Sequence, residues 1–205
     1  MKFNFKEKKG FTLLEIIIVV AMLAVLAAII TPVVIHEMDK ADITAALAGV
    51  NAIIKATENF RSDTKEYPDS RNHNTDPDYF YYLYSSGNGP VFDGSNWGNQ
   101  FDGIINHLIL NNSDGDSSYG ETNDDYPGWN SQTLIGWHGP YLDSANSPDP
   151  WGNCYLAGVH AFWKTSAGIV YAWMLSSGPD GKVQTDDSDN EIQGDDIGKW
   201  IAFAP

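Results

Sequence analysis

The sequence has little that could cross-link the chain or perform catalysis. Cys154 is the only cysteine among 205 residues, so no intrachain disulfide can form, and a buried, inert thiol is favoured over intermolecular pairing. Basic residues are also scarce, because 12 Lys and Arg stand against 27 Asp and Glu and give a formal net charge of -15. A surface this acidic excludes nucleic acid as a partner and favours divalent cations or plain solubility.

Catalytic motifs are missing as well. The sequence contains no serine nucleophile elbow, no zinc-protease motif and no phosphate-binding loop. The histidines are scattered without the spacing of metal ligands: His36, His73, His107, His138 and His160. We therefore predict that the protein is not an enzyme.

One long apolar run is present near the N-terminus. From Phe11 to Ile30 only Thr12 and Glu15 are polar, and twenty helical residues span about 30 Å, the thickness of a bilayer's hydrocarbon core. Four lysines precede the run, which predicts a single-pass protein with a cytoplasmic N-terminus. Within hydrocarbon, Glu15 would cost roughly 2.5 to 3.5 kcal/mol and so requires a partner.

The string KGFTLLE at residues 9–15 resembles the type III signal of type IV pilins and of type II secretion pseudopilins. The resemblance implies that a prepilin peptidase and methyltransferase removes a leader, residues 1–10, by cutting after Gly10, and then methylates Phe11. The new amine could neutralise Glu15 of its own or a neighbouring subunit. The resemblance further implies that Glu15 sets subunit register in a helical filament. A secretory signal peptide and a plain membrane anchor are the alternatives, and neither explains Glu15.

The apolar pattern continues beyond Pro32 with one buried stripe between Ile43 and Phe60. We predict one helix from Phe11 to about Ser62, with residues 11–35 as its transmembrane and assembly half and residues 36–205 as a soluble pilin-like domain. The expected fold class is α+β, a pilin-like lollipop whose long helix packs on a small antiparallel β-sheet with long loops. Alternating residues predict antiparallel strands at Tyr155–Trp163 and Gly168–Ser176, a last strand including Trp200–Phe203, and a short helix within Phe101–Asn112.

An inserted region, residues 69–136, is dense in loop-forming residues and matches no part of the pilin pattern. Its aromatic run from Tyr79 to Tyr84 is expected to pack over the sheet, with an exposed adhesive or inter-subunit patch as the alternative. Part of the region has the spacing of an EF-hand loop, but Tyr119 stands where glycine is needed, so a solvated polar loop is favoured over calcium there. The four residues with that spacing are Asp114, Asp116, Ser118 and Asp125.

Carboxylates are crowded between Ser176 and Trp200, a segment that we call the acid loop. Crowded carboxylates repel one another unless water or a cation separates them, and Ca²⁺ accepts six to eight oxygen ligands in irregular geometry. Zinc is not expected without clustered His or Cys. A merely solvated loop is the alternative. The acidic residues are Asp180, Asp186, Asp187, Asp189, Glu191, Asp195 and Asp196.

The acid loop, together with GPYL at 139–142 and DPWGN at 149–153, is similar to the calcium-loop region of the major pseudopilin of type II secretion. The resemblance implies side-chain ligands from Asp180, Asp195 and Asp196, with backbone carbonyls near Ser177 and Lys182. Calcium would then stand in for the disulfide that many type IV pilins have. Because the stretch from Gly181 to Asp195 is longer than the family usually has, Asp186 or Asp187 could substitute for one ligand.

Two filament functions follow from these resemblances. The first is the major-type pseudopilin of a type II secretion system, and the second is a type IV pilin of an extracellular fibre for adhesion or motility. Either implies copies of the chain, minor pilins or pseudopilins and an inner-membrane assembly platform as partners, and the lipid bilayer before assembly. The implied location is the inner membrane, with the globular domain periplasmic or extracellular. A sensor or hydrolase on a membrane anchor is the third alternative.

Overall fold

The computed structural model describes residues 10–68, 82–95, 97, 101–112, 126–143, 147–159, 162 and 171–201. Contacts divide the chain into two compact units, Met1–Ala41 and Asp42–Pro205. The EF-hand-like spacing at 114–125, the leader up to residue 9 and the aromatic residues 79–81 lie outside the described residues.

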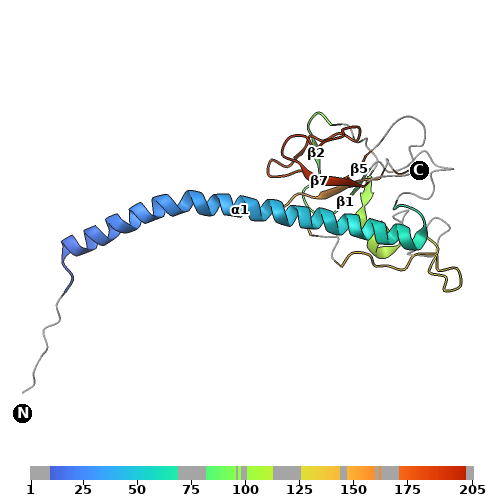
Figure 1. Cartoon of the computed structure of the whole chain (residues 1–205), viewed down its shortest axis with the longest axis horizontal. Coiled ribbons are helices and arrows are strands. Elements are labelled where there is room, and N and C mark those ends of the chain that lie inside the picture. The colour runs from blue at the N-terminus through green and yellow to red at the C-terminus, as the bar shows by residue number, and fades with distance from the viewer. Residues whose placement is uncertain are drawn as a thin grey trace, which may run out of the picture. The chain divides into compact units, whose positions relative to one another are not determined.

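One helix, α1, runs from Leu13 to Thr64 and contains 52 residues, so the predicted long helix is confirmed to within two residues at each end (Figure 1). The helix continues through Pro32, where one backbone hydrogen bond is lost because proline has no N–H. Just before it, the Thr31 hydroxyl donates to the Ala27 carbonyl at 2.7 Å. Large apolar side chains from Leu13 to Ile35 are 47% to 78% exposed in this single copy. By length and composition α1 could therefore cross a membrane.

The main sheet has five strands in the order β3-β1-β4-β5-β7. Antiparallel pairing of β4 with β5, and of β5 with β7, confirms the predicted pair of antiparallel strands. The expectation of a wholly antiparallel sheet is wrong, because β1 pairs with β3 in parallel. Residues 85–100 between these two strands are long enough for a crossover connection. The strands are β1 Tyr82–Tyr84, β3 Phe101–Gly103, β4 Tyr155–Gly158, β5 Ala172–Ser176 and β7 Ile197–Ile201.

Three further findings concern the shorter elements. The short helix predicted within Phe101–Asn112 is confirmed over residues 104–110, of which the π-helical part, η1, spans Asn106–Leu110. The last strand, predicted to include Trp200–Phe203, begins at Ile197 and is described to Ile201, so it is confirmed as far as the described residues reach. A second, two-stranded parallel sheet joins β2, Val91–Phe92, to β6, Lys182–Val183.

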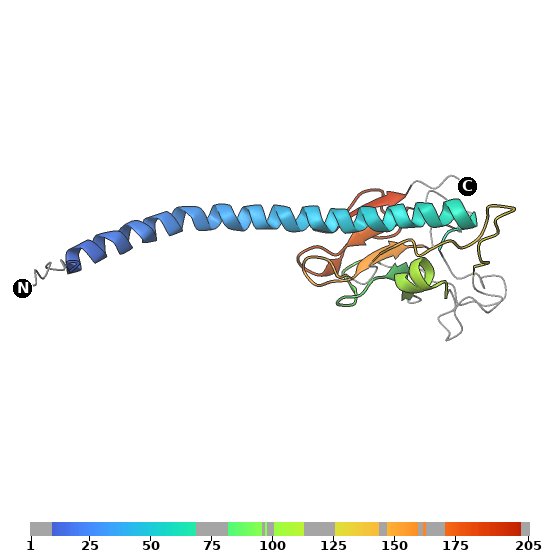
Figure 2. The same cartoon turned by 90° about the horizontal axis from the view of Figure 1, so that it is seen from below.

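The central strands β4 and β5 of the main sheet are buried on both faces. The second half of α1 lies along one face of the sheet (Figure 2). There Val50, Ile53 and Phe60 of α1 pack with sheet residues such as Met174. Close packing requires Gly49, because a Cβ there would lie 2.3 Å from the Tyr155 hydroxyl oxygen. On the other face, a second cluster covers the sheet: Tyr82, Trp97, Cys154, Leu156, Trp173, Leu175 and Val183. The α+β class is thus confirmed, and β5 alternates between two cores.

Two sequence predictions lie in this second cluster. Tyr82 is buried and contacts the rings of Phe92 and Trp97 edge-on, so the described part of the aromatic run packs over the sheet as expected. Cys154 is buried too, and burial raises the pKa of its thiol to about 11. The predicted burial of this thiol is confirmed, and its inertness stays a prediction.

Candidate functional site

The first candidate site is the start of α1. The Glu15 N–H donates to Thr12 Oγ1 at 3.2 Å, and the Thr12 N–H donates to Glu15 Oε2 at 3.5 Å. These reciprocal bonds form a capping box, in which the two side chains satisfy backbone donors at the first turn of a helix. Gly10 and Phe11 therefore lie outside the helix and are exposed, with the predicted cleavage point between them. The Thr-x-x-Glu spacing at residues 12–15 is the sequence signal of this cap, and the interpretation of Glu15 as an acid that requires a partner does not use it.

The second feature of this site is the carboxylate of Glu15. Within the part of the chain that the structure describes, no cationic side chain pairs with it. A capping bond to one N–H leaves most of the carboxylate's capacity for hydrogen bonds unused. An amine supplied at Phe11 of the same or another copy would fill that need.

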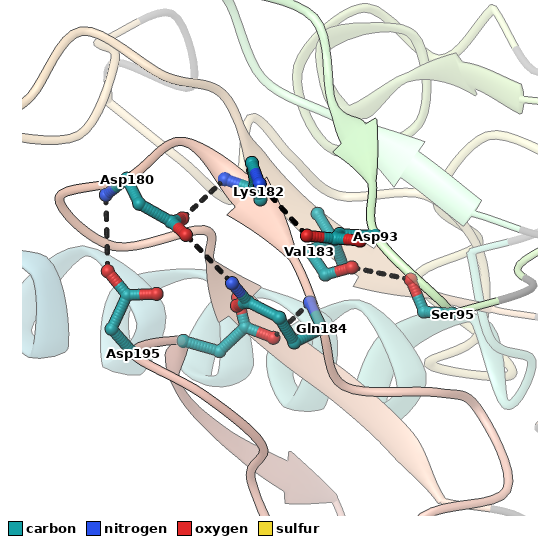
Figure 3. Close-up of polar contacts among 8 residues, drawn as sticks. Asp93, Ser95, Asp180, Lys182, Val183, Gln184 and Asp195 are labelled. Carbon is teal, nitrogen blue, oxygen red and sulfur yellow. Dashed lines mark hydrogen bonds and ion pairs between the residues drawn. The ribbon is translucent and has the colours of Figure 1, made fainter.

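The second candidate site is the acid loop, which leaves the sheet after β5 and returns at β7. The Asp180 N–H donates to Asp195 Oδ2 at 3.1 Å, so the first and last parts of the loop lie side by side (Figure 3). Gly178 permits this approach, since it has φ +65° and an added Cβ would lie 2.2 Å from the Asp195 carbonyl oxygen and 3.1 Å from its Oδ2. Two of the three predicted carboxylate ligands are thereby brought together.

The Asp180 carboxylate also organises its own side of the loop. Its Oδ1 accepts a hydrogen bond from the Lys182 N–H at 2.8 Å, and its Oδ2 accepts one from the Gln184 side-chain amide Nε2 at 2.9 Å (Figure 3). Each carboxylate oxygen can accept a second partner. The arrangement can therefore receive a cation without losing these bonds.

Asp196, the third predicted ligand, points to a different set of donors. Its side chain is 6% exposed, and its Oδ2 accepts the N–H groups of Gln184 and Thr185 at 3.0 and 2.7 Å. Burial raises the pKa of this carboxyl, and the bonds from Thr185 and Gln184 oppose that rise. Among the described residues, Asp196 Oδ1 and Gln184 Oε1 are buried and have no hydrogen-bond partner. Buried acceptors without donors are costly unless a cation, a proton or water serves them.

The two substitutes that we predicted lie farther along the loop. Asp186 Oδ1 accepts both the N–H and the hydroxyl of Ser188, so Asp186 closes a local turn. Asp187 follows it within the same turn. Over the described ranges, no three acidic, histidine or cysteine side chains converge into a group that could hold a metal. The loop thus offers hard oxygen ligands, namely the carboxylates of Asp180 and Asp195, two residues that contact each other, and two orphaned buried oxygens. Such ligands suit Ca²⁺ better than Zn²⁺.

Sequence reasoning missed the residue that ties the acid loop to the sheet. Asp149 is 4% exposed; its Oδ1 accepts the N–H groups of Trp151 and Asn153 at 3.0 and 2.8 Å. Its Oδ2 accepts the Ser176 hydroxyl at 2.6 Å, and that hydroxyl accepts the Gly178 N–H at 3.2 Å. The turn at DPWGN could be predicted from the sequence, because an aspartate side chain commonly bonds the backbone N–H two residues later. The bond from Ser176 to Asp149 could not be predicted, because the two residues are 27 positions apart and no local pattern links them.

Two tryptophans hold the far side of the acid loop against the sheet. The Trp97 indole N–H donates to the Thr185 carbonyl at 2.7 Å, and the Trp173 indole N–H donates to the Asp189 carbonyl at 3.1 Å. Both rings belong to the second core cluster. The loop is therefore packed as well as hydrogen-bonded.

Comparison with known proteins bears on the first site directly. Residues 5–31 match the prokaryotic N-terminal methylation motif. The chain is 36% identical over 66 residues to type II secretion system core protein G of Pseudomonas aeruginosa, which is 32% of this chain and 46% of that protein. The start of α1, which is the first site, thus matches a prokaryotic N-terminal methylation motif.

Other relatives carry related names. It is 34% identical over 62 residues to type II secretion system core protein G of Escherichia coli, covering 30% of the chain and 43% of that protein. It is 36% identical over 62 residues to the type IV wide pilus major component PilA4 of Thermus thermophilus, covering 30% and 47%. The chain thus spans less than half the length of the curated relatives that it matches. No solved structure matches it significantly.

Proposed function

We propose that the chain is a structural subunit of a helical type IV pilus-like filament, the major-type pseudopilin of a type II protein secretion system. The observation that carries the proposal is the start of α1, where an exposed Gly10–Phe11 step precedes a capped helix with an apolar surface. The methylation motif over residues 5–31 covers the same place. Relatives named as core protein G of secretion systems support the pseudopilin function in particular.

Assembly follows from the exposure of α1. The apolar side chains between Leu13 and Ile35 need a nonpolar environment, which the bilayer supplies before assembly and the same helices of other copies supply in a filament. After cleavage behind Gly10, the methylated Phe11 amine pairs with Glu15 of a neighbouring copy. That ion pair fixes the axial register, because neither charge can be hydrated inside the bundle.

The finer assignments belong to the same proposal. A prepilin peptidase and methyltransferase processes the chain, and minor pseudopilins and an inner-membrane platform assemble it. The N-terminus faces the cytoplasm and the domain after residue 35 faces the periplasm. The lysines that precede the apolar segment support this orientation.

Calcium is the proposed resident ion of the acid loop. Asp180 and Asp195 would hold it, with Asp196 and backbone carbonyls near Ser177 and Lys182 as further ligands. Bound there, calcium would neutralise carboxylates and cross-link the two ends of the loop. The adjacent Asp180 and Asp195 and the orphaned Asp196 Oδ1 support this assignment.

A type IV pilin of a surface fibre is the second candidate. It is favoured by the relative named as a wide pilus component and by an exposed apolar tip in the segment that follows the undescribed part of the insertion. The tip consists of Trp129, Leu134 and Ile135. Shearing cells separates the candidates, since abundant surface fibres of this chain would contradict the pseudopilin function.

Processing is the test of the proposal itself. Expressed with a prepilin peptidase, the chain should lose residues 1–10 and gain one methyl group, as measured by intact mass. Gly10→Val should block cleavage, and the block would be due to the peptidase, because a Cβ at Gly10 meets nothing within 4 Å. Gly89→Val is the matched control in equally open space. A mature protein that begins at Met1, or that never associates with its own copies, would refute the proposal.

A further inference from the structure

The acid loop contains its own cation. Between Ser176 and Trp200 there are seven acidic and two basic residues, Lys182 and Lys199. The Lys199 ammonium donates to Asn51 on α1 at 2.9 Å, which leaves Lys182 as the cation at the acidic part of the loop. Its pairing in β6 fixes its position, since Lys182 lies opposite Val91 and Val183 lies opposite Phe92 in the parallel pair with β2.

The segment after β2 holds the Lys182 side chain at the loop. Lys182 Nζ lies 2.9 Å from Asp93 Oδ2, and both side chains are about half exposed (Figure 3). Two further bonds fix Asp93 beside the loop, because the Asp93 N–H and the Ser95 hydroxyl both donate to the Val183 carbonyl, at 3.0 and 2.6 Å. Asp93 is thus hydrogen-bonded to β6, the strand that contains Lys182.

The backbone of Lys182 contacts one of the two carboxylates that we assign to calcium, because its N–H donates to Asp180 Oδ1 at 2.8 Å (Figure 3). The hydrogen bond from the Lys182 ammonium to Asp93 and the charge of Asp93 raise the pKa of Lys182, and the charges of Asp180 and Asp195 act in the same direction. A positive charge in the same loop as two carboxylates lowers their attraction for a divalent ion. It also reduces their mutual repulsion when no ion is bound.

We propose that Lys182 is a built-in competitor for the divalent cation of the acid loop, and that Asp93 holds its ammonium at the rim so that the cation can enter. The inference rests on the proposed calcium assignment and adds the residue that sets its affinity. Without metal, the positive charge of Lys182, held at Asp93, offsets part of the negative charge of Asp180 and Asp195. With metal, Asp93 retains the ammonium.

Titration of Ca²⁺ into the full-length, EDTA-stripped chain in detergent tests the competition by calorimetry. Lys182→Gln should bind Ca²⁺ roughly three- to tenfold more tightly, the effect of removing one positive charge several ångströms from a divalent ion in a partly solvated site. Lys55→Gln removes the same charge from an exposed lysine on α1 and should leave the affinity unchanged. Unchanged or weaker binding by Lys182→Gln would overturn the proposal.

The role of Asp93 is tested by a double-mutant cycle. Asp93→Asn frees the ammonium to approach Asp180 and Asp195, so it should weaken Ca²⁺ binding severalfold in the presence of Lys182. In the Lys182→Gln background, Asp93→Asn should weaken Ca²⁺ binding by at most about twofold, because only the attraction between the Asp93 charge and the ion is then lost. Equal effects in the two backgrounds would show that Asp93 acts on the ion directly, which contradicts its holding role.

Melting in EDTA separates this inference from the calcium assignment. Lys182→Gln should melt at a lower temperature than the wild type in EDTA. When Ca²⁺ is added, this difference in melting temperature should shrink or reverse, whereas Lys55→Gln should match the wild type with and without Ca²⁺. If neither wild type nor Lys182→Gln binds Ca²⁺, the competitor role fails together with the calcium assignment. The filament function is judged separately by N-terminal processing.

Discussion

Removal of the Asp149 carboxylate should destabilise the protein more than removal of any single carboxylate of the acid loop. Asp149→Ala removes the acceptor of two backbone N–H groups and one hydroxyl, and Asp149 itself is only 4% exposed. Hydrogen bonds to a charged group contribute about 1.5 to 3 kcal/mol each, and part of this loss is recovered where water enters. We therefore expect the free energy of unfolding to fall by about 3 to 5 kcal/mol.

Smaller changes apportion this effect. Asp149→Asn keeps an oxygen for the N–H groups of Trp151 and Asn153 but places an amide opposite the Ser176 hydroxyl, so it should cost about 1 to 2 kcal/mol. Ser176→Ala should cost a similar amount, because it leaves Asp149 Oδ2 buried without a donor. The double variant should cost less than the sum of the two, since both remove the same bond.

Urea unfolding of the full-length chain in detergent, followed by tryptophan fluorescence, measures these losses. Asp143→Ala, at an exposed aspartate of the same segment, is the control and should stay within about 0.5 kcal/mol of the wild type. A loss below about 1 kcal/mol for Asp149→Ala, or strictly additive single variants, would refute the reasoning that Asp149 ties the DPWGN turn to the acid loop.

Three further predictions follow from burial. Because burial raises the pKa of Cys154 to about 11, its thiol should react with iodoacetamide only as fast as the protein unfolds, and rapid labelling of the native chain would contradict this. Because burial also raises the pKa of Asp196, the folded carboxyl binds its proton more tightly than the unfolded one, so stability in EDTA should fall as pH rises above the ordinary carboxyl range. Asp196→Asn should remove that pH dependence of the melting temperature and should melt at a higher temperature than the wild type near neutral pH. A plot of melting temperature against pH that runs parallel to that of the wild type would contradict this prediction. Gly49→Ala should cost about 1 to 3 kcal/mol by its collision with Tyr155, while Ala48→Ser at the exposed neighbouring position should be near neutral in the same urea assay.

The sequence was most informative where one physical pattern acts over a long stretch. The mostly apolar run from Phe11 to Ile30 and the stripe from Ile43 to Phe60 specify α1 to within two residues at each end, because one pattern extends over many helical turns. The strands β4 and β5 were located for a similar reason, since their residues alternate between two buried clusters. Their ends were not located, because loss of pairing and not loss of pattern ends a strand.

Partners distant in sequence explain what was missed. The parallel pairing of β1 with β3 depends on a crossover through residues 85–100, and three-residue strands are too short to reveal direction by their pattern. The bond from Ser176 to Asp149 and the ion pair of Lys182 with Asp93 join segments 27 and 89 residues apart. Local spacing predicts the turn at each end of such a contact, but the pairing itself arises only when the sheet brings the two segments together.

The acid loop illustrates the same limit for a candidate site. Its residue types pointed to hard oxygen ligands, and the structure does bring Asp180 against Asp195 across the close approach at Gly178. Asp196 follows Asp195 directly, yet its carboxylate is committed to the N–H groups of Gln184 and Thr185. Adjacent residues in an extended segment point to opposite sides, so two consecutive aspartates serve one ion only if the backbone turns between them. Calcium binding by Asp196 would therefore require Asp196 Oδ1, the oxygen that the two N–H groups leave unused, and this makes Asp196→Asn a measure of ligation when calcium is present and of burial when it is absent.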